Sequence, residues 1–420
     1  MTKGEAYQNS TLFLGLTKKN GFKALKLYSY KPIDGTGDFT WARSSTAYRF
    51  AQSGILEIMA IGVPRVDYSN TCPELLIEKQ STNLLKHSQE FDNTDWVKIN
   101  TTVTANATTA PDGTTTADKL IPSAVNGRHS IDQNITSITG FYTQSVYAKK
   151  SELDKFSLYD ATNTGGWVSF DLTNGTILST GAGATGTIKN ISNGWYCCTI
   201  TFNCTLKTRI DVWILPNSYT TGDPFLSPFT GNGTDGIYLW GGQLESGEYA
   251  TSYILTGNST VTRVADVAYN NSLDMTAGTG TLFIRARVKS STFDKVDVIA
   301  TLNDTSDEGY ITMYTDENNN LTISTYVNPD QNDYTYALGA NGIYNIAVGY
   351  DLNLAKINIA VNGVLKRANA TTANALVGGV LRIDLGSIYN GISPQIDNRI
   401  IGAMWFDTQL SDSDIVAITA

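Results

Sequence analysis

The sequence predicts an all-β protein made of two antiparallel β-sandwich domains behind an N-terminal arm. Three observations support this fold class. The chain has 420 residues, which is more than one hydrophobic core usually serves. It holds 37 Gly and 22 Tyr but only 10 Pro, a composition typical of many short strands joined by tight turns. Segments that alternate apolar and polar residues recur about every 8 to 15 residues, with no helical period.

The charge of the chain limits the classes of molecule that it is expected to bind. With 41% hydrophobic and 16% charged residues the chain is expected to pack into a core, and its net charge of -9 argues against nucleic-acid binding. Residues 1–31 are an exception, because they carry six lysines against one glutamate, a local +5. Lysine recurs through this segment, at Lys3, Lys18, Lys19, Lys23, Lys26 and Lys31. No apolar run has the length of a membrane span, so we expect no membrane insertion.

The first 73 residues are expected to form two parts. Residues 1–37 alternate loosely between apolar and lysine-rich positions, which predicts a basic amphipathic arm that docks onto other proteins. The alternative is an edge hairpin of the first domain. Residues 38–73 are expected to form a strap that crosses the sandwich following them.

Residues 74–256 are predicted to form the first sandwich. Alternating segments occur at 140–149, 156–160, 166–172, 195–202, 209–215 and 236–244. A jelly roll is the simplest closed arrangement for them. Asn174-Gly175 suits a two-residue hairpin turn, because both residues tolerate positive φ.

The segment from Leu75 to Trp96, LLIEKQSTNLLKHSQEFDNTDW, carries a family resemblance. It resembles the opening of the carbohydrate-binding-module-like domain of bacteriophage head-spike and tail fibre proteins. The resemblance continues at 145–149 (SVYAK), 194–196 (GWY), 232–245 (NGTDGIYLWGGQLE) and 250–253 (ATSY), and it covers roughly residues 38 to 256. It implies a jelly-roll domain and a place in a virion.

Residues 257–420 are predicted to form the second sandwich. Asn362-Gly363 suits a hairpin turn between alternating strands, and Ser411 or Ser413 suits the N-cap of a terminal helical turn. Two segments of this region resemble the laminin-G/concanavalin A-like fold. They are IYNIAVGYDLNLAKINIAVNGVLKR and, after it, GAMWFDTQLSDSDIVAI.

The sequence offers no catalytic site. Only His87 and His129 could act as histidine bases, and neither has a nucleophile motif nearby. The acidic run 90–95 lies in the segment that matches the family's framework, so we expect no glycosidase carboxylate pair there. We therefore predict a protein that is not an enzyme. The four cysteines are expected to be reduced and buried.

No cofactor is predicted, although calcium could bind at either of two acidic turns, 303–308 and 316–320. Both turns also read as ordinary polar hairpin tips. The sequence names no ligands for a metal.

Aromatic residues on loops are the candidates for glycan binding, because sugar rings stack on aromatic faces. Trp167 follows Gly165-Gly166, and Tyr334 and Tyr336 alternate in Asn-Asp-Tyr-Thr-Tyr. The alternative for Trp167 is a core position. Trp195 and Trp240 match the family's framework and are expected in the core.

The family resemblance implies a virion protein, made in the host cytoplasm, and with the candidate aromatic residues it favours one that displays β-sandwiches for adhesion to host-surface or environmental glycans. Head attachment is slightly favoured over tail attachment. Two alternatives stay open, a glycan-active enzyme or its accessory module, and an inert capsid decoration protein. Weak sugar sites gain from avidity, so we expect a homo-oligomer, a trimer first and a dimer second.

Overall fold

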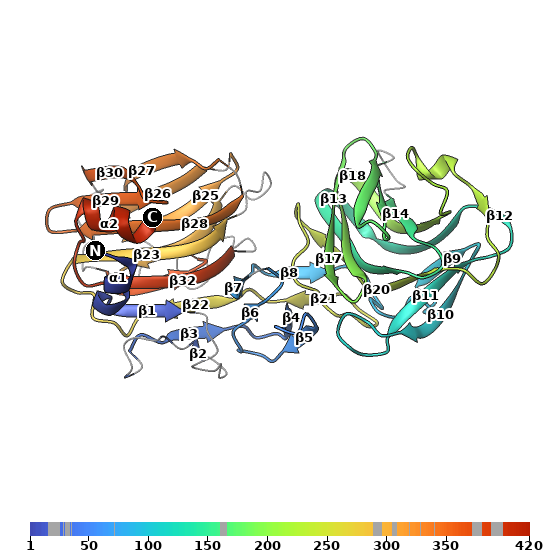
Figure 1. Cartoon of the computed structure of the whole chain (residues 1–420), viewed down its shortest axis with the longest axis horizontal. Coiled ribbons are helices and arrows are strands. Elements are labelled where there is room, and N and C mark those ends of the chain that lie inside the picture. The colour runs from blue at the N-terminus through green and yellow to red at the C-terminus, as the bar shows by residue number, and fades with distance from the viewer. Residues whose placement is uncertain are drawn as a thin grey trace. The chain divides into compact units, whose positions relative to one another are not determined.

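The computed structural model forms two compact units (Figure 1). Unit 1 comprises Met1–Arg49, Ile58–Gln80 and Val264–Ala420, and unit 2 comprises Phe50–Glu57 and Ser81–Arg263. The structure describes all residues except 16–25, 28, 30–33, 35, 71, 160–165, 289–295, 305–308, 319, 328, 340, 372–379 and 388–397. Strands make up about 58% and helices about 5%, which confirms the all-β class.

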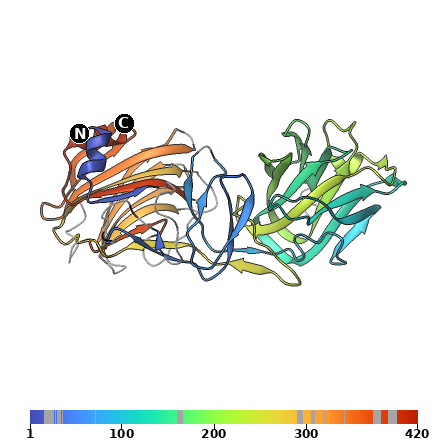
Figure 2. The same cartoon turned by 60° about the horizontal axis from the view of Figure 1, so that its bottom comes forward.

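Unit 1 is a sandwich of two antiparallel sheets, which Figure 2 shows as stacked layers. Sheet A runs in the order β30 (Val364–Thr371), β29 (Lys356–Val361), β28 (Gly342–Asp351), β23 (Thr279–Val288), β32 (Asn398–Phe406), β7 (Glu74–Ile77), β6 (Val66–Asp67), with β1 (Leu12–Gly15) also paired to β32. Sheet B runs β2 (Lys26–Leu27), β3 (Phe39–Ala42), β22 (Val267–Asn270), β31 (Arg382–Leu385), β24 (Val296–Asn303), β25 (Gly309–Asp316), β26 (Asn320–Val327), β27 (Asp330–Ala337). Alternate side chains of both sheets meet in one apolar core.

Two short helices cover part of the outer face of sheet A. They are α1 (Lys3–Asn9) and α2 (Asp412–Thr419), and with Phe283, Met404 and Phe406 they form a second apolar cluster. Ser411 is the N-cap of α2, since its hydroxyl accepts the backbone N–H of Asp414 at 3.2 Å. The predicted helical turn and one of its two candidate caps are therefore confirmed. Neither helix has the length and apolar character that crossing a bilayer requires, and this holds for the described residues.

Unit 2 is built on two long antiparallel strands, β13 (His129–Lys150) and β18 (Trp195–Leu215). Their register shifts between Asn134 and Gly140, and the partners on either side of them change at that point. The first layer is β9 (Trp96–Ile99), the first half of β13, the second half of β18, β14 (Lys155–Tyr159), β15 (Trp167–Asp171) and β16 (Thr176–Thr180). The second layer is β10 (Thr101–Thr108), β11 (Ala117–Pro122), β20 (Ile237–Ser246), the second half of β13, the first half of β18 and β17 (Ala184–Ser192).

The apolar core of unit 2 lies between these two layers. Trp195 and Trp240 are buried, at 2% and 0% exposed, but they lie outside this core cluster, in which they are expected. Trp240 packs instead against Tyr147 and Tyr253. Short elements complete the chain: β4 (Ala47–Phe50), β5 (Leu56–Met59), β8 (Ser81–Asn83), β12 (Asn126–Gly127), the 3-10 helix η1 (Pro224–Leu226), β19 (Phe229–Thr230) and β21 (Val261–Arg263).

The two Asn-Gly turns differ. Asn362 and Gly363 both have positive φ, 47° and 74°, and join β29 directly to β30 as predicted. Between β15 and β16 only Gly175 has positive φ, and four residues separate the strands. The predicted two-residue turn at Asn174-Gly175 is wrong, because the Asp171 carboxylate caps a longer turn by accepting the N–H groups of Thr173 and Asn174.

The N-terminal residues do not form the predicted arm. Residues 12–15 pair with β32, and Leu12 and Leu14 are fully buried in the core of unit 1. The terminal ammonium of Met1 contacts Asp414 at 2.7 Å. Residues 38–49 also belong to unit 1, where β3 pairs with β22. The lysines at 18, 19, 23 and 31 lie outside the described residues. The predicted division into arm and strap therefore needs correction. Strand pairing between residues more than 200 positions apart makes both segments part of unit 1.

The Leu75–Trp96 segment is a framework segment. Asn83 satisfies both ends of its amide: Nδ2 donates to the carbonyls of Gly242 (3.1 Å) and Ile254 (2.9 Å), and Oδ1 accepts the N–H groups of Leu85 and Leu244 (both 3.1 Å). Phe91 and Trp96 fill the core of unit 2. Residues 81–96 therefore hold strands of unit 2 in place, whereas residues 75–80 belong to unit 1.

Candidate functional site

The outer face of the first layer of unit 2 carries polar and aromatic side chains. On β18, Ile210, Val212 and Ile214 enter the core, so the alternation of a strand turns Asp211 and Trp213 to the opposite face. The same alternation on β14 sends Phe156 and Leu158 inward and Tyr159 outward. The face opposite the core thus combines carboxyl and aromatic groups.

One row of this face crosses the layer. Asp132 of β13 is the cross-strand partner of Asp211, Asp211 is the partner of Tyr159, and Tyr159 is the partner of Trp167 on β15. Directly opposite residues in a sheet have Cβ atoms about 5 Å apart. The row therefore places two carboxyl groups beside two aromatic rings. We call Asp132, Asp211, Tyr159, Trp167 and Trp213 the carboxyl-aromatic face.

The three rings of this face are stacked. Tyr159 lies almost parallel to Trp213, with centroids 4.2 Å apart, and to Trp167, with centroids 6.4 Å apart. The guanidinium of Arg128 lies 4.9 Å from the ring centre of Trp213, a cation–π distance. Trp167 is half-buried, and its Nε1 donates to Ser179 Oγ at 3.3 Å. Trp167 is therefore held in one orientation while keeping part of its surface accessible.

The two carboxyl groups influence each other. Asp132 and Asp211 are 4% and 0% exposed. Burial first, and then the charge of Asp132, raise the pKa of Asp211 to about 8, although Arg209 lies 2.9 Å from its Oδ1. At neutral pH Asp211 therefore keeps its proton and can donate a hydrogen bond, and a carboxyl oxygen of Asp132 can accept one. A donor next to an acceptor is the arrangement that binds a hydroxyl group.

Several buried polar atoms of this face have no hydrogen-bond partner in the described part of the chain. They are Ser130 Oγ, Asp132 Oδ1, Asp211 Oδ2 and Trp213 Nε1. Asp211 Oδ1 forms an ion pair with Arg209. Native proteins rarely leave so many polar atoms unsatisfied in one place, and each such atom calls for a partner such as water or a ligand. The carboxyl-aromatic face is therefore the candidate site.

Of the three residues predicted to bind glycans, Trp167 alone lies on this face. Tyr334 and Tyr336 belong to unit 1, on the last strand of sheet B, and pack against its core. The side chains of Arg367 and Lys366 on β30 lie over their rings, at 5.8 Å and 6.0 Å from the ring centres. The rings thus line the seam between β27 and β30. They are not presented as open stacking surfaces.

Sequence reasoning missed Asp132, Asp211, Tyr159 and Trp213. The pattern RIDVWIL at 209–215 contained a signal, because it places an aspartate and a tryptophan on the face opposite three aliphatic residues. No local pattern could pair Asp211 with Asp132, since 79 positions separate them and the register of β13 on β18 decides their contact.

The two histidines have structural contacts. His87 Nδ1 lies 2.5 Å from Glu90 Oε2, and the two nitrogens of His129 face the carbonyls of Asn100 (2.6 Å) and Phe229 (3.0 Å). Their rings hold loops together.

The described residues of the two acidic turns show no metal ligand set. Residues 305–308 of the first turn lie outside the described residues. In the second, Asp316 accepts the backbone N–H groups of Asn318 and Asn320 and so closes its own turn. The described residues contain no cluster of three or more His, Cys, Asp or Glu that could hold a metal.

Comparisons with known proteins add a fold-level likeness. No protein-family model and no curated protein matches the chain. Among solved structures, the CBM40 domain of Ruminococcus gnavus IT-sialidase is 16% identical and covers 35% of this chain and 85% of its own, with a TM-score of 0.30.

Two other matches are similarly distant. A botulinum neurotoxin type C structure, described as dependent on two ganglioside molecules for cell entry, is 13% identical, covers 37% of this chain and 39% of its own, and has a TM-score of 0.30. The SAP-like pentraxin of Limulus polyphemus is 10% identical, covers 34% and 70%, and has a TM-score of 0.27. Likeness this weak carries no argument about function, which must be argued from the residues.

Proposed function

We propose that the protein is a glycan-binding protein whose carboxyl-aromatic face takes a sugar ring. The observation that carries this proposal is the row Asp132–Asp211–Tyr159–Trp167, in which two neighbouring carboxyl groups lie beside stacked rings. A sugar offers an apolar C–H face to an aromatic ring and hydroxyls to paired donors and acceptors. Trp167 would supply the stacking surface and the carboxyl pair would fix hydroxyl groups.

The test is a glycan array screen with the full chain, followed by affinity measurements on the glycans retained. Trp167→Ala should weaken binding by about fivefold or more, since loss of an aromatic partner commonly costs about 1 kcal/mol. Tyr334→Ala is the matched control, because it removes an aromatic ring from the seam of unit 1. Binding lost in the control but kept in Trp167→Ala would place the site in unit 1. Retention of no glycan at all would refute the proposal.

A second candidate function, glycan hydrolysis, has one observation in its favour. Glycosidases use two carboxyl groups of different protonation state, and burial beside Asp132 raises the pKa of Asp211. We nevertheless propose binding without catalysis. Asp132 and Asp211 are 4% and 0% exposed, so the pair can meet a hydroxyl group at its edge but cannot flank a glycosidic bond, as hydrolysis requires. Release of reducing sugar from a bound glycan, abolished in both Asp132→Asn and Asp211→Asn, would establish the enzyme instead.

We further propose that these sandwiches are displayed on a phage virion, as a head or tail fibre or spike. The resemblance of the Leu75–Trp96 segment supports this part of the proposal. Projection images of particles with and without the protein would locate it. Loss of host-surface binding on its deletion would separate an adhesin from an inert decoration protein.

Assembly into a homo-oligomer belongs to the same proposal. Several weak sugar sites joined in one particle would gain avidity at a repetitive surface. Light scattering of the full chain at micromolar concentration should give a trimer or a dimer. A stable monomer would remove avidity from the explanation.

A further inference from the structure

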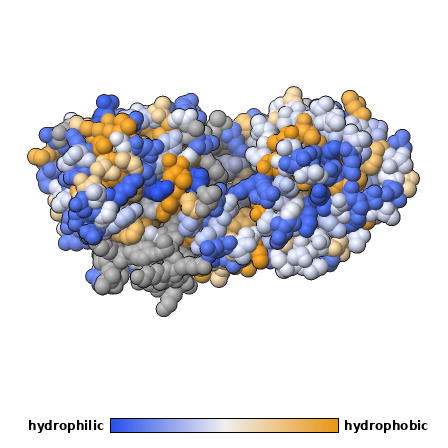
Figure 3. Space-filling model, in the orientation of Figure 1, coloured by the Kyte–Doolittle hydropathy of each residue, from blue (hydrophilic) through white to orange (hydrophobic). Residues whose placement is uncertain are grey.

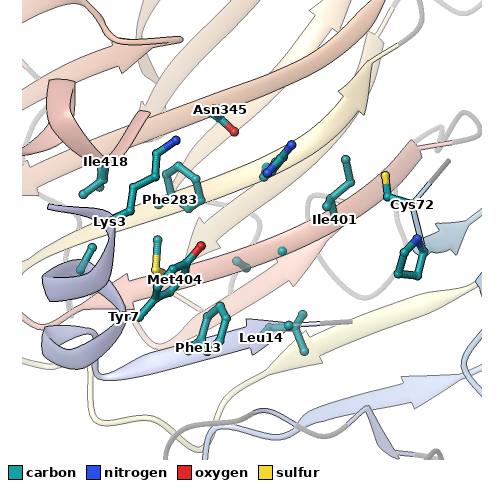
Figure 4. A pocket seen from close by; sticks show the side chains of 16 residues that line it. Lys3, Tyr7, Phe13, Leu14, Cys72, Phe283, Asn345, Ile401, Met404 and Ile418 are labelled. Carbon is teal, nitrogen blue, oxygen red and sulfur yellow. The ribbon is translucent and has the colours of Figure 1, made fainter. Parts of the chain in front are cut away.

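Unit 1 contains a cavity of about 250 Å³ on the outer face of sheet A. Figure 4 shows Lys3 and Tyr7 of α1 at one end of it and Cys72 at the other, with Phe13, Phe283 and Met404 between. All of these residues belong to unit 1, so the cavity is separate from the carboxyl-aromatic face.

The cavity exists because two glycines lie opposite each other on neighbouring strands of sheet A. Gly15 on β1 and Gly402 on β32 are cross-strand partners, and neither has a side chain to fill the space above the sheet. The next outward-facing row holds Phe13, Met404 and Phe283, which are partners across the same strands. The bulky row and α1 therefore form walls around a floor made of glycine.

Two cations line the cavity. Lys3 Nζ donates to the carbonyl of Ala420 at 2.7 Å, and Arg285 lies at the floor. Arg285 on β23 is the cross-strand partner of Gly402 on one side and of Asn345 on the other. It is exposed, and it has no ion pair or hydrogen bond within the described ranges of the chain. The neighbouring Arg287 differs, because Glu74 lies 2.6 Å from it. A free guanidinium beside an apolar cavity is suited to a carboxylate.

One buried acceptor also faces the cavity. The side-chain nitrogen of Asn345 donates to the carbonyl of Thr419 at 3.0 Å, which leaves its Oδ1 for another donor. This oxygen is buried and has no partner among the described residues. Figure 4 shows the Asn345 side chain at the edge of the cavity. A ligand that fits would bring an N–H or O–H group to this oxygen.

We propose that this cavity binds a small apolar carboxylate that carries an amide N–H or a hydroxyl next to its carboxylate. The apolar part would lie against Phe13, Phe283 and Met404, the carboxylate against Arg285, and the N–H or O–H group against Asn345. The volume lies below the range usual for drug-sized ligands, which limits the apolar part to about one ring or a short chain. The carboxylate of a free acid and that at a peptide C-terminus share this chemistry, and the proposal commits to the free acid.

The probe is N-acetyl-phenylalanine, titrated into the full chain by calorimetry. Arg285→Gln should weaken binding by about tenfold to a hundredfold, the usual worth of a charge-assisted hydrogen bond. Lys356→Gln is the matched control, since it removes an exposed cation of β29 outside the cavity and should leave the affinity unchanged. Gly402→Ala should also weaken binding, because the added Cβ would project from the floor and lies 3.3 Å from the Leu14 carbonyl.

Analogues of the probe test each contact. N-acetyl-phenylalanine amide lacks the charge and 3-phenylpropionate lacks the N–H group, and both should bind more weakly. Cys72 lines the cavity and is half-buried, so bound ligand should slow its alkylation by iodoacetamide, measured by mass spectrometry. These readouts are independent of glycan binding by unit 2.

Several results would overturn the proposal. The first is that the probe fails to saturate the protein at millimolar concentration. The second is that Arg285→Gln binds it as tightly as the unaltered protein does, and the third is that the acid and its amide bind equally. Binding of a longer peptide that ends in phenylalanine, without binding of the free acid, would also overturn it in favour of a peptide site.

Discussion

Asp132 on β13 and Asp211 on β18 stand directly opposite each other as cross-strand partners, both nearly fully buried. Like groups placed this way cannot both ionise cheaply, so the fold holds a proton on Asp211 in a range where the unfolded chain would release it. The pair thus links the candidate glycan site to the pH dependence of stability.

Asp211→Asn should therefore change how the stability of unit 2 varies with pH. Below about pH 4 the carboxyl is protonated in both states. Between pH 4 and the folded-state pKa of about 8 only the unfolded chain loses the proton, so the free energy of unfolding falls as pH rises. Asparagine has no proton to release in this range, so the variant does not lose free energy of unfolding as pH rises. At pH 9 the variant should be more stable than the unaltered protein by on the order of 3 kcal/mol.

Denaturant unfolding at pH 5, 7 and 9 measures this effect. Asp95→Asn in the same unit is the control, because Asp95 is exposed and should leave the slope unchanged. Identical pH slopes for Asp211→Asn and the unaltered protein would show that Asp211 is ionised in the folded state.

Asn83→Ala should destabilise unit 2 by about 2–4 kcal/mol. The substitution leaves the N–H groups of Leu85 and Leu244 and the carbonyls of Gly242 and Ile254 without the amide that pairs them. Thermal unfolding followed by circular dichroism gives the change. Asn258→Ala, at an exposed position of the same unit, should be neutral, and an equal shift in the two variants would contradict the anchoring role.

Arg65→Met should destabilise unit 1 by about 3–5 kcal/mol. The guanidinium of Arg65 is fully buried, and it contacts Glu78 at 2.6 Å and also Asp266, which Arg43 contacts at 2.9 Å. Removal of Arg65 leaves buried negative charge without its partner. Lys356→Met, at an exposed position, is the control. A stability change that disappears in 1 M salt would be inconsistent with a buried network, because salt screens mainly exposed pairs.

Leu14→Ala should destabilise unit 1 by about 2–5 kcal/mol, because Leu14 is fully buried between the sheets. Leu354→Ala is the control, since Leu354 is 64% exposed. Removal of residues 1–15 should cost more, as it also deletes β1 and α1. Unfolding midpoints and protease resistance would show this. If the truncated protein kept its full stability, residues 1–15 would be a detachable arm after all.

Much of the architecture could be predicted because its signals are local. Alternation of period two marks strands such as 209–215, Asn362-Gly363 has the backbone freedom that its turn requires, and Ser411 carries the side chain that caps α2. The composition likewise predicted the all-β class. These features depend on residues within a few positions of one another, so the sequence by itself determines them.

The tertiary structure decided which distant segments meet. The pairing of β1 with β32 brings residues 12–15 into unit 1. The register of β13 on β18 places Asp132 opposite Asp211. Gly15 and Gly402 likewise form a cavity floor only because their strands are neighbours. A shift of one residue in a strand turns every side chain to the other face, so register alone decides whether these residues form a site. That register is chosen by the burial of whole sheets, which no short stretch of sequence records.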